Sequence, residues 1–564
     1  MRVSNYIFMF AVFVVLSVEA RDNRLVRLLR GLYERDDIKS EIKYAEGFEG
    51  SFDGDFEPIE DENSLHNTMP LDKKDAGGNQ PNIIIILADD LGYNDVGYHN
   101  PDVITPTIDK LVKKGIKLDN HYALPLCTPS RYAIMSGVYP FRAGMSHGVE
   151  SAYVAHCAPM FYDFLPAYLK KVGYENIAVG KWHLGFCDEK CTPNARGFDK
   201  SYGYYNGFTR YYQHTSSGGG FDLHKDNVIE YETIGTHTMK LFSDYITKTI
   251  KEQDKAKPFF IYASFPSPHS PYEAEPKYME LYKDKDMPNS RKMFLSLVSS
   301  LDNSVKRIVD DLKEADLYDN TIIIFQSDNG GATFGPASNA PLRGTKLSLF
   351  EGGVKVPAFI SSPLIKDSRV VTGITHTVDV PVTIMDLAGV DESEYQELDG
   401  VSFADVITKG TEPERTEFVL NIDLEEPKLA GQEALRSGKW KLIQGFAGLF
   451  TGYENNITLI QPKLPDHMVG YFKTTGVNTD VMEENKIILP DILLFNIEKD
   501  PEEHTNVAAE NPDVVKNLQE KLDEYHTQYV KSFQGTIKPE GMPDQNEGSW
   551  KTGWCSVNEN GIEN

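Results

Sequence analysis

Short runs of branched and aromatic apolar residues recur along the chain from residue 81 onward, and polar turns bound each of them. Runs of this length and composition indicate buried β-strands, because helices are usually longer. The predicted strands lie in the segments NIIIILADD (82–90), NIAVGKWHLG (176–185), PFFIYASF (258–265) and TIIIFQSDNG (321–330). These runs are too short to cross a bilayer, so we expect no stable membrane span.

Segments with helical spacing of apolar residues separate the strands. The segment TPTIDKLVKKG predicts a helix that Pro106 opens and Gly115 closes. Two further helical patterns occupy 160–174 and 292–314. This alternation predicts an α/β fold with a largely parallel sheet.

The pattern changes again beyond about residue 430. Strands are predicted within EALRSGKWKLIQG (433–445) and DILLFNIEKD (491–500), followed by a helix over 512–529. We therefore expect a main domain over 81–430 and a smaller C-terminal α+β domain over 431–564.

The first 80 residues differ from the rest. Residues 1–20 (MRVSNYIFMFAVFVVLSVEA) carry Arg2, a short apolar run and a cleavage site after Ala20, which is typical of a secretory signal peptide; a signal anchor is the alternative. Residues 46–62 contain eight acids and no Lys or Arg, so we interpret 21–80 as a flexible leader or propeptide. The protein is expected to enter the secretory pathway and to be secreted or lysosomal.

Charge and cysteine content narrow the possible functions. The 57 Lys and Arg against 84 Asp and Glu give a net charge of −27, which argues against a nucleic-acid partner but allows a local cationic pocket. Disulfides are possible in a secreted protein, and five cysteines leave one unpaired. The sequence Asn456-Ile457-Thr458 is a candidate glycosylation site.

Candidate chemistry gathers where the predicted strands end. Asp89 and Asp90 follow one strand, and Asp328 and Asn329 follow another. Because ligands collect at the carboxyl ends of parallel strands, these oxygens can form one hard site for Ca²⁺ or Mg²⁺, whereas zinc would recruit more His or Cys. A pair of adjacent acids is, by itself, more often a cap or a solvated turn.

Two lysines and two histidines lie close to these strand ends in the sequence. Lys181 and His183 flank Trp182 on one side of a segment expected to be extended, and the simpler interpretation is a surface lysine beside a core histidine. His269 lies in a proline-rich loop and Lys346 in a glycine-flanked loop. An isolated lysine in a loop is usually solvated, so Lys346 is a candidate site residue only because of the sequence around it.

Cys127 lies in the segment LCTPSR, in an expected Thr-Pro-Ser turn. Its residues and several others match sequence blocks of one family, in the family's order. The matching blocks are LADDLGYNDVG (87–97), CTPSR (127–131), GKWHLG (180–185), RGFDKSYGYYNG (196–207), SDNGG (327–331), LRGTKLSLFEGGVKVP (342–357) and LFNIEKDPEEHTNVA (494–508). The chain resembles the formylglycine-dependent sulfatases over residues 81–532, in a pattern similar to that of arylsulfatase B, an N-acetylgalactosamine-4-sulfatase. It departs from the family at Met135-Ser136-Gly137-Val138, where the glycine is kept and an arginine is lost.

The resemblance implies an alkaline-phosphatase-like fold, with a large mixed and mainly parallel sheet between helices, and hydrolysis of aryl or carbohydrate sulfate esters. It implies that the formylglycine-generating enzyme oxidises Cys127 to Cα-formylglycine, whose hydrate attacks sulfur. It also implies the following roles: Asp89, Asp90, Asp328, Asn329 and modified Cys127 bind one Ca²⁺; Arg131 stabilises the formylglycine; Lys181 and His183 hold the aldehyde hydrate; His269 and Lys346 grip the sulfate and the leaving oxygen.

If Cys127 is modified, the other four cysteines can form two disulfides. The resemblance favours Cys157–Cys191, which leaves Cys187–Cys555. Two alternatives to a sulfatase remain at this point. One is a phosphoester hydrolase of the same fold, which would use Thr or Ser with two zinc ions. The other is a catalytically silent binding protein with the same fold.

Overall fold

The computed structural model describes residues 80–453 apart from residue 427, and residues 458–459, 487–533 and 537–563. The predicted signal peptide, nearly all of the predicted leader and the candidate glycosylation site Asn456 lie outside these residues. Among the residues described, helices that combine the length and the apolar character needed to cross a bilayer do not occur.

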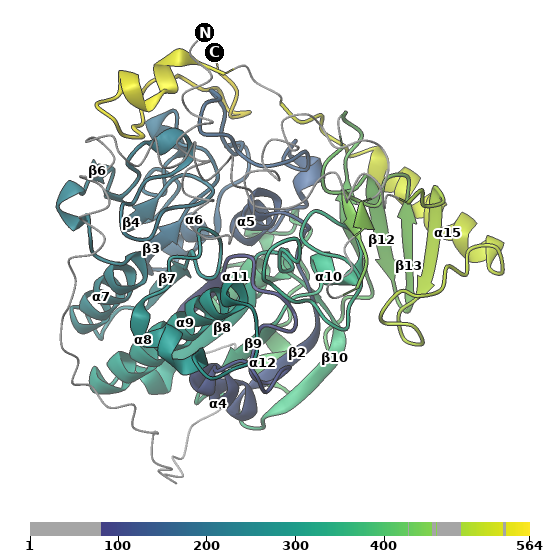
Figure 1. Ribbon diagram of the computed structural model, residues 1–564, viewed down its shortest axis with the longest axis horizontal. Helices are drawn as coiled ribbons and strands as arrows, with labels where there is room; N and C mark the ends of the chain where they lie inside the picture. Colours follow the sequence, from purple (N-terminus) through teal and green to yellow (C-terminus); the bar gives the residue numbers. More distant parts are fainter. Residues whose placement is uncertain (1–79, 427, 454–457, 460–486, 534–536, 564) are drawn as a thin grey trace, which may run out of the picture. The chain divides into compact units, whose positions relative to one another are not determined.

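Within the described residues, ten strands form the main sheet, in the order β10-β2-β9-β8-β1-β7-β3-β4-β5-β6 (Figure 1). Their bounds are β1 Asn82–Ala88, β2 Ile116–Tyr122, β3 Glu175–Lys181, β4 Lys200–Tyr204, β5 His224–Lys225, β6 Val228–Ile229, β7 Phe259–Ser264, β8 Thr321–Ser327, β9 Ala358–Ser361 and β10 Arg369–His376. Strands β8, β1, β7, β3 and β4 run parallel to one another, and β10 is parallel to β2. Strand β9 is antiparallel to both of its neighbours, as are the short edge strands β5 and β6. The prediction of a mixed, mainly parallel sheet is confirmed.

Helices cover both faces of this sheet. Their bounds are α4 Pro106–Lys114, α5 Cys127–Ser136, α6 Leu165–Lys171, α7 Thr238–Lys251, α8 Pro276–Met279, α9 Asn289–Glu314, α10 Glu351–Val354, α11 Asp379–Ala388 and α12 Ala404–Thr408. Ile83, Ile85 and Leu87 pack in a core with residues of α5, α6, α11 and α12, whereas Ile84 and Ile86 pack with residues of α4, α7 and α9. Alternate side chains of a strand point to opposite faces, so a strand covered on both sides is apolar throughout.

A second, antiparallel sheet has the strand order β11-β12-β13-β16. Its strands are β11 Glu417–Ile422, β12 Glu433–Ser437, β13 Trp440–Gln444 and β16 Ile492–Asn496, and β14 (Phe450–Thr451) pairs separately with β15 (Thr458–Leu459). Helix α15 (Pro512–His526) buries Leu518 and Leu522 in the core of this sheet. Strand β11 lies before residue 431, the predicted start of the C-terminal domain, so this sheet begins earlier in the chain than that predicted domain.

The helix predictions differ in accuracy. Helix α4 ends before Gly115, as predicted, and α9 covers the whole predicted segment 292–314. The helix predicted over 160–174 is too long, because only Leu165–Lys171 is helical and Phe164 before it is extended. Pro166 in the first turn fits this later start, since proline at a helix start lacks only an N–H that has no helical partner.

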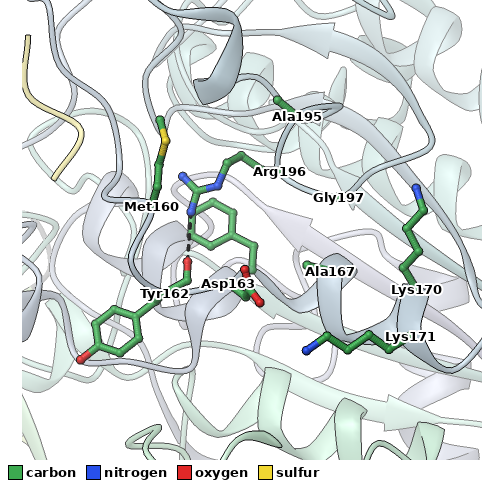
Figure 2. Close-up of a pocket in the computed structure, with 10 residues that line it drawn as sticks. Met160, Tyr162, Asp163, Ala167, Lys170, Lys171, Ala195, Arg196 and Gly197 are labelled. Atoms are coloured by element: carbon green, nitrogen blue, oxygen red, sulfur yellow. Dashed lines mark hydrogen bonds between the residues drawn. The ribbon is translucent and has the colours of Figure 1, made fainter. Parts of the chain in front are cut away.

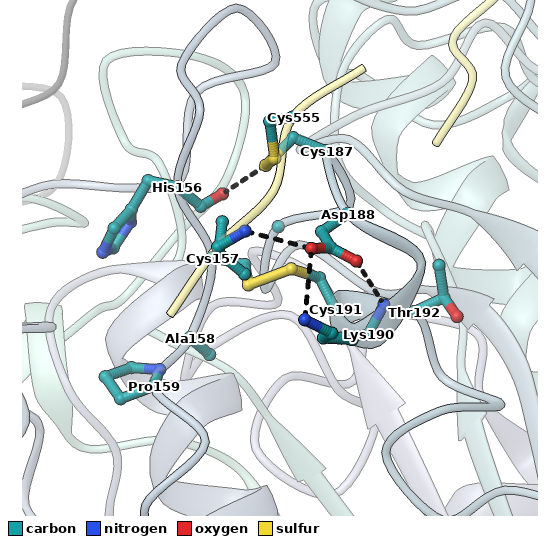
Figure 3. The surroundings of a disulfide bond; sticks show 12 residues. His156, Cys157, Ala158, Pro159, Cys187, Asp188, Lys190, Cys191, Thr192 and Cys555 are labelled. Carbon is teal, nitrogen blue, oxygen red and sulfur yellow. Dashed lines mark hydrogen bonds and ion pairs between the residues drawn. A yellow bond between two sulfur atoms is a disulfide. The ribbon is translucent and has the colours of Figure 1, made fainter. Parts of the chain in front are cut away.

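Two disulfides join the loop after β3 to distant parts of the chain (Figure 3). They are Cys157–Cys191 and Cys187–Cys555, the pairs that the sequence resemblance implies. Beside them, Asp188 accepts a hydrogen bond from the backbone N–H of Val557 at 3.0 Å. The C-terminal segment is thus held covalently and by hydrogen bonds against the loop that follows β3.

Candidate active site

The order of the central strands brings the predicted site residues to one edge of the sheet. Strands β8, β1, β7 and β3 are consecutive and parallel, so their carboxyl ends lie side by side. Asp89 and Asp90 follow β1, Asp328 and Asn329 follow β8, and Lys181 is the last residue of β3. The expected convergence at the strand ends is therefore present in the structure.

Cys127 is the first residue of α5 and the free cysteine among the described residues. Its buried Sγ lies 3.3 Å from Lys346 Nζ, 3.8 Å from Asp89 Oδ1 and 4.0 Å from Asp90 Oδ1. The expected Thr-Pro-Ser turn is wrong, because these residues begin a helix with Pro129 in its first turn. Every residue of α5 is buried, so the helix has no polar face that would reveal it in the sequence.

Three buried carboxylates at this edge are each paired with a buried cation. The closest contacts are 2.7 Å for Lys181–Asp89, 2.6 Å for Lys346–Asp90 and 2.8 Å for Arg131–Asp328. Three negative charges therefore meet three positive charges. Lys181 and Lys346 are therefore buried and ion-paired in this cluster, and neither is a solvated surface residue.

Arg131 connects three strands at the base of this cluster. Its guanidinium is fully buried and bonds Asp328 Oδ2 through both Nε and Nη2, at 3.1 and 2.8 Å. Nη1 donates to Ser264 Oγ at 2.5 Å and to the Lys181 carbonyl at 3.2 Å. Arg131 thus fixes the ends of β8, β7 and β3 relative to α5, and Ser264 is a site residue that the sequence analysis did not identify.

His183 is held by hydrogen bonds to backbone and hydroxyl groups. Its φ of +56° is left-handed, so the expected extended segment ends at Lys181. Nε2 lies 3.2 Å from the Glu150 carbonyl, and the Thr128 hydroxyl donates to the His183 carbonyl at 3.0 Å. Because a carbonyl only accepts, Nε2 carries the proton and Nδ1 is the free acceptor.

His269 lies in the loop that follows β7 and faces Asp90. Its Nδ1 contacts the Ser270 carbonyl at 2.6 Å, and its Nε2 lies 3.7 Å from Asp90 Oδ2. The buried Tyr211 hydroxyl donates to the His269 carbonyl at 3.1 Å and so holds this loop. Neither Tyr211 nor Glu150 carries a signal in the sequence, because their contributions depend on tertiary contacts.

Burial and charge shift the pKa values of the cluster. Burial, followed by the Asp328 charge, raises the pKa of the Cys127 thiol to about 12. Burial opposes the ionised form of Asp90, but Lys346 and His269 outweigh it and lower the pKa of that carboxyl. Burial, with Lys181 and Arg131 adding to it, holds the pKa of His183 well below its usual range. At neutral pH the Asp90 carboxyl is therefore ionised, the Cys127 thiol is protonated and His183 is neutral.

The donor set fits a hard cation. Ligand atoms of Asp89, Asp90, Cys127 and Asp328 all lie within 4.8 Å of one another. The amide oxygen of Asn329 is buried without a hydrogen-bond partner in the described part of the chain, while Nδ2 donates to Asp90 Oδ1 at 2.8 Å. Carboxylates together with an unsatisfied amide oxygen are the ligands that Ca²⁺ prefers.

A separate cavity of about 360 Å³ is lined by residues outside this cluster, including Lys170, Lys171 and Arg196 (Figure 2). Lys170 pairs with Asp199 and Lys171 with Glu394, at 2.6 and 2.7 Å. The Arg196 guanidinium donates to backbone carbonyls. Lys170 and Lys171 are exposed on α6, whereas Lys181, Lys346 and Arg131 are buried where the ligands of such a sheet collect, so the cluster around Cys127 is the better site for an anionic substrate.

Buried cations at the carboxyl edge of a mainly parallel sheet are the arrangement expected of a hydrolase that acts on anionic esters. A family model described as Sulfatase matches residues 81–390. The chain belongs to the sulfatase family, has the alkaline-phosphatase-like fold and is a sulfuric ester hydrolase.

Individual relatives agree with this assignment. Arylsulfatase J of Mus musculus is 34% identical over 498 residues, which cover 84% of this chain and 80% of that protein. N-acetylgalactosamine-6-sulfatase of Homo sapiens is 28% identical over 385 residues, covering 64% of this chain and 72% of that protein. The crystal structure of Ps i-CgsB in complex with k-i-k-neocarrahexaose superposes with a TM-score of 0.67 at 26% identity, covering 83% of this chain and 96% of that one. The predicted sulfate ester hydrolysis is confirmed, and these matches give no support to the phosphoester hydrolase or the silent binding protein.

Proposed function

We propose that this sulfatase uses Cα-formylglycine, produced from Cys127 by the formylglycine-generating enzyme, together with one Ca²⁺. The observation that carries the proposal is the environment of Cys127. A thiol with its pKa raised to about 12 is a poor nucleophile, yet it lies within 4.0 Å of Lys346, Asp89 and Asp90. We therefore expect the nucleophile at position 127 to be a group other than the thiol.

The formylglycine hydrate supplies one hydroxyl that attacks sulfur and a second whose deprotonation releases sulfate and restores the aldehyde. The ligands proposed for calcium are Asp89, Asp90, Asp328, Asn329 and modified Cys127. Bound there, Ca²⁺ adds two positive charges to a cluster whose side-chain charges balance, and so favours a sulfate monoester anion.

Individual side chains then have separate tasks. Lys346 and Lys181 contact sulfate oxygens and neutralise the charge that develops on them. His183 takes a proton at Nδ1, the nitrogen left free by its Glu150 contact. His269 presents Nε2 to the leaving oxygen. Arg131 keeps Asp328 in position through its hydrogen bonds to that carboxylate.

Carbohydrate sulfates are the substrate class that we propose. Two of the relatives support it, since one is named for N-acetylgalactosamine and the other was solved with a neocarrahexaose. We further propose that the protein is made in the secretory pathway and is secreted or lysosomal, because the formylglycine proposal and the first 20 residues agree on that route.

Mass spectrometry of the peptide that contains Cys127, taken from active protein, tests the proposal. We expect an aldehyde in place of the thiol. The variant Cys127→Ala should lose turnover of an aryl sulfate while its melting temperature stays close to that of the wild type, because Cys127 is not part of a disulfide. An unmodified thiol in fully active protein would refute the mechanism.

The same preparation tests the substrate class. A panel of sulfated monosaccharides, sulfated oligosaccharides and small aryl sulfates should show a higher kcat/KM for one of the sugars. A preference for aryl sulfates over every sugar would contradict the carbohydrate proposal and leave the formylglycine proposal untouched.

A further inference from the structure

Two buried carboxylates and one buried lysine meet outside the catalytic cluster, between α10 and the smaller sheet. The Lys441 ammonium, on β13, lies 2.9 Å from Glu351 Oε1 and 2.9 Å from Glu503 Oε1. All three side chains are fully buried. We refer to Glu351, Lys441 and Glu503 as the buried triad.

Other contacts fix the first residue of α10 within the buried triad. A Glu503 oxygen accepts the backbone N–H of Glu351 at 2.6 Å. The Tyr122 hydroxyl donates to Glu351 Oε2 at 2.8 Å, and Arg436 donates to that hydroxyl at 2.7 Å. Tyr122 ends β2 and leads directly to the segment that carries Cys127, so Glu351 is bonded from both sheets.

Helix α10 is in turn joined to the catalytic cluster by the backbone. Lys346 lies five residues before Glu351, and its N–H donates to the Gly331 carbonyl at 3.1 Å. At the other end of α10, the Gly353 carbonyl accepts the N–H of Gly330 at 2.9 Å. A shift of α10 is therefore transmitted both to Lys346 and to the segment that follows Asn329.

Stability alone does not account for such an arrangement. Removing ionisable side chains from water is expensive, and well-packed apolar side chains of the same volume often stabilise a core as well or better. What charged groups add is a fixed geometry, because each oxygen has a defined partner. The buried triad fixes α10 against β13, and α10 carries the loop of Lys346.

We propose that Glu351, Lys441 and Glu503 are positioning residues that place Lys346 against Asp90 and Cys127. The inference rests on the sulfate-binding role of Lys346 in the proposed function. The smaller sheet then contributes to catalysis through Lys346 and not by contact with the substrate.

A double-mutant cycle tests this coupling in the full-length protein. Lys441→Met should lower kcat/KM for an aryl sulfate by about 10- to 100-fold, the effect of misplacing one catalytic group. In a Lys346→Ala background the same change should cost less than about threefold, because coupled residues are not additive. The affinity for inorganic sulfate should follow the same pattern in the wild type, Lys441→Met, Lys346→Ala and the double variant. It is measured by competition or thermal shift, and sulfate binding does not depend on turnover.

Two further variants keep the test decisive. Lys439→Met removes an exposed lysine from the same hairpin and should leave kcat/KM unchanged. If Lys441→Met does not fold, Lys441→Met combined with Glu503→Gln removes one charge of each sign, and the cycle is run with that pair. Equal losses in the wild-type and Lys346→Ala backgrounds would overturn the proposal and leave the buried triad a purely structural feature.

The two proposals fail in different measurements. Mass spectrometry at Cys127 on the same wild-type sample decides the formylglycine mechanism. The cycle compares ratios of kcat/KM and of sulfate affinity, so it remains interpretable whatever the nucleophile proves to be.

Discussion

At the scale of single residues, backbone strain shapes the active site. Asp90, His183 and Leu347 have φ values of +64°, +56° and +72°, in a region that non-glycine residues rarely adopt. Each such residue costs about 1–3 kcal/mol and persists only where neighbouring contacts hold it. Two of those contacts are the Asp90 N–H to Asp328 Oδ1 at 3.2 Å and the His183 N–H to the Tyr205 carbonyl at 3.0 Å. Three of the nine non-glycine residues with positive φ in the described chain therefore lie where the site side chains converge.

Variants of Asn329 can distinguish calcium binding from packing, because the amide oxygen of Asn329 is a proposed calcium ligand. In protein stripped with a chelator, we expect Ca²⁺ to raise the melting temperature of the wild type, because a ligand that binds only the folded state stabilises it. The shift should be smaller in Asn329→Ala, which lacks the amide oxygen. It should be retained in Asn329→Asp, which keeps an oxygen donor. Differential scanning fluorimetry over a calcium titration measures this, and an undiminished shift in Asn329→Ala would remove Asn329 from the ligand set.

At the scale of elements, the sequence predicts best what depends on local pattern. The apolar runs that form β1, β7 and β8 are covered on both faces, so their composition alone marks them. The long amphipathic pattern of α9 is equally clear. Helix α5 is missed because it has no exposed face, and β9 is missed because it is only four residues long, with three of them apolar.

The same distinction applies to the site. Asp89, Asp90 and Asp328 are predictable because strand ends of a parallel sheet converge, whatever the details of packing. Ser264, Glu150 and the contacts of Thr128 are not predictable, since each acts on another residue far away in the sequence. Their effect arises only when loops from different strands pack together.

Thr128 links α5 to the loop that carries His183. Its hydroxyl donates to the His183 carbonyl at 3.0 Å and accepts the Glu150 N–H at 3.1 Å. Thr128→Val keeps the shape but leaves two backbone groups without partners, at a cost of about 1–3 kcal/mol for a buried group. We expect a lower free energy of unfolding in urea and a kcat/KM reduced by about 10-fold or more.

The matched variant for this prediction is Thr128→Ser, which keeps the hydroxyl and should retain most of both quantities. If Thr128→Val and Thr128→Ser behave alike, the hydrogen bonds of Thr128 do not position His183.

At the scale of the whole described chain, several links join the C-terminal third to the main sheet, and two of them are an apolar core and a disulfide. One is the apolar core shared by Tyr122, Phe350 and Leu442, which brings β2, the α10 segment and β13 together. The other is the Cys187–Cys555 disulfide, which closes a loop of 368 residues close to His183. Both links end beside residues of the catalytic cluster, so the C-terminal part supports the site and not only its own sheet.

The buried triad also makes stability depend on pH. Burial, followed by Glu351, raises the pKa of Glu503 from its ordinary 4.5 to about 7, against the opposing effect of Lys441. The folded state therefore holds a proton that the unfolded state releases between these values. This contribution to the free energy of unfolding is complete below pH 4.5 and is lost as pH rises through about 7. Glu503→Gln removes the titration. The free energy of unfolding of the wild type should therefore fall relative to that of the variant as the pH rises from 4.5 to 8.

Urea unfolding at a series of pH values measures this difference, with Glu498→Gln, at an exposed position after β16, as the control. The control difference should stay flat across the same range, because Glu498 is exposed and lies outside the buried triad. A flat curve for Glu503→Gln as well would show that Glu503 stays ionised in the folded protein, held by Lys441. The opposite slope would show that Lys441 lowers the pKa of Glu503 below its ordinary value, so that this carboxylate stabilises the fold at neutral pH.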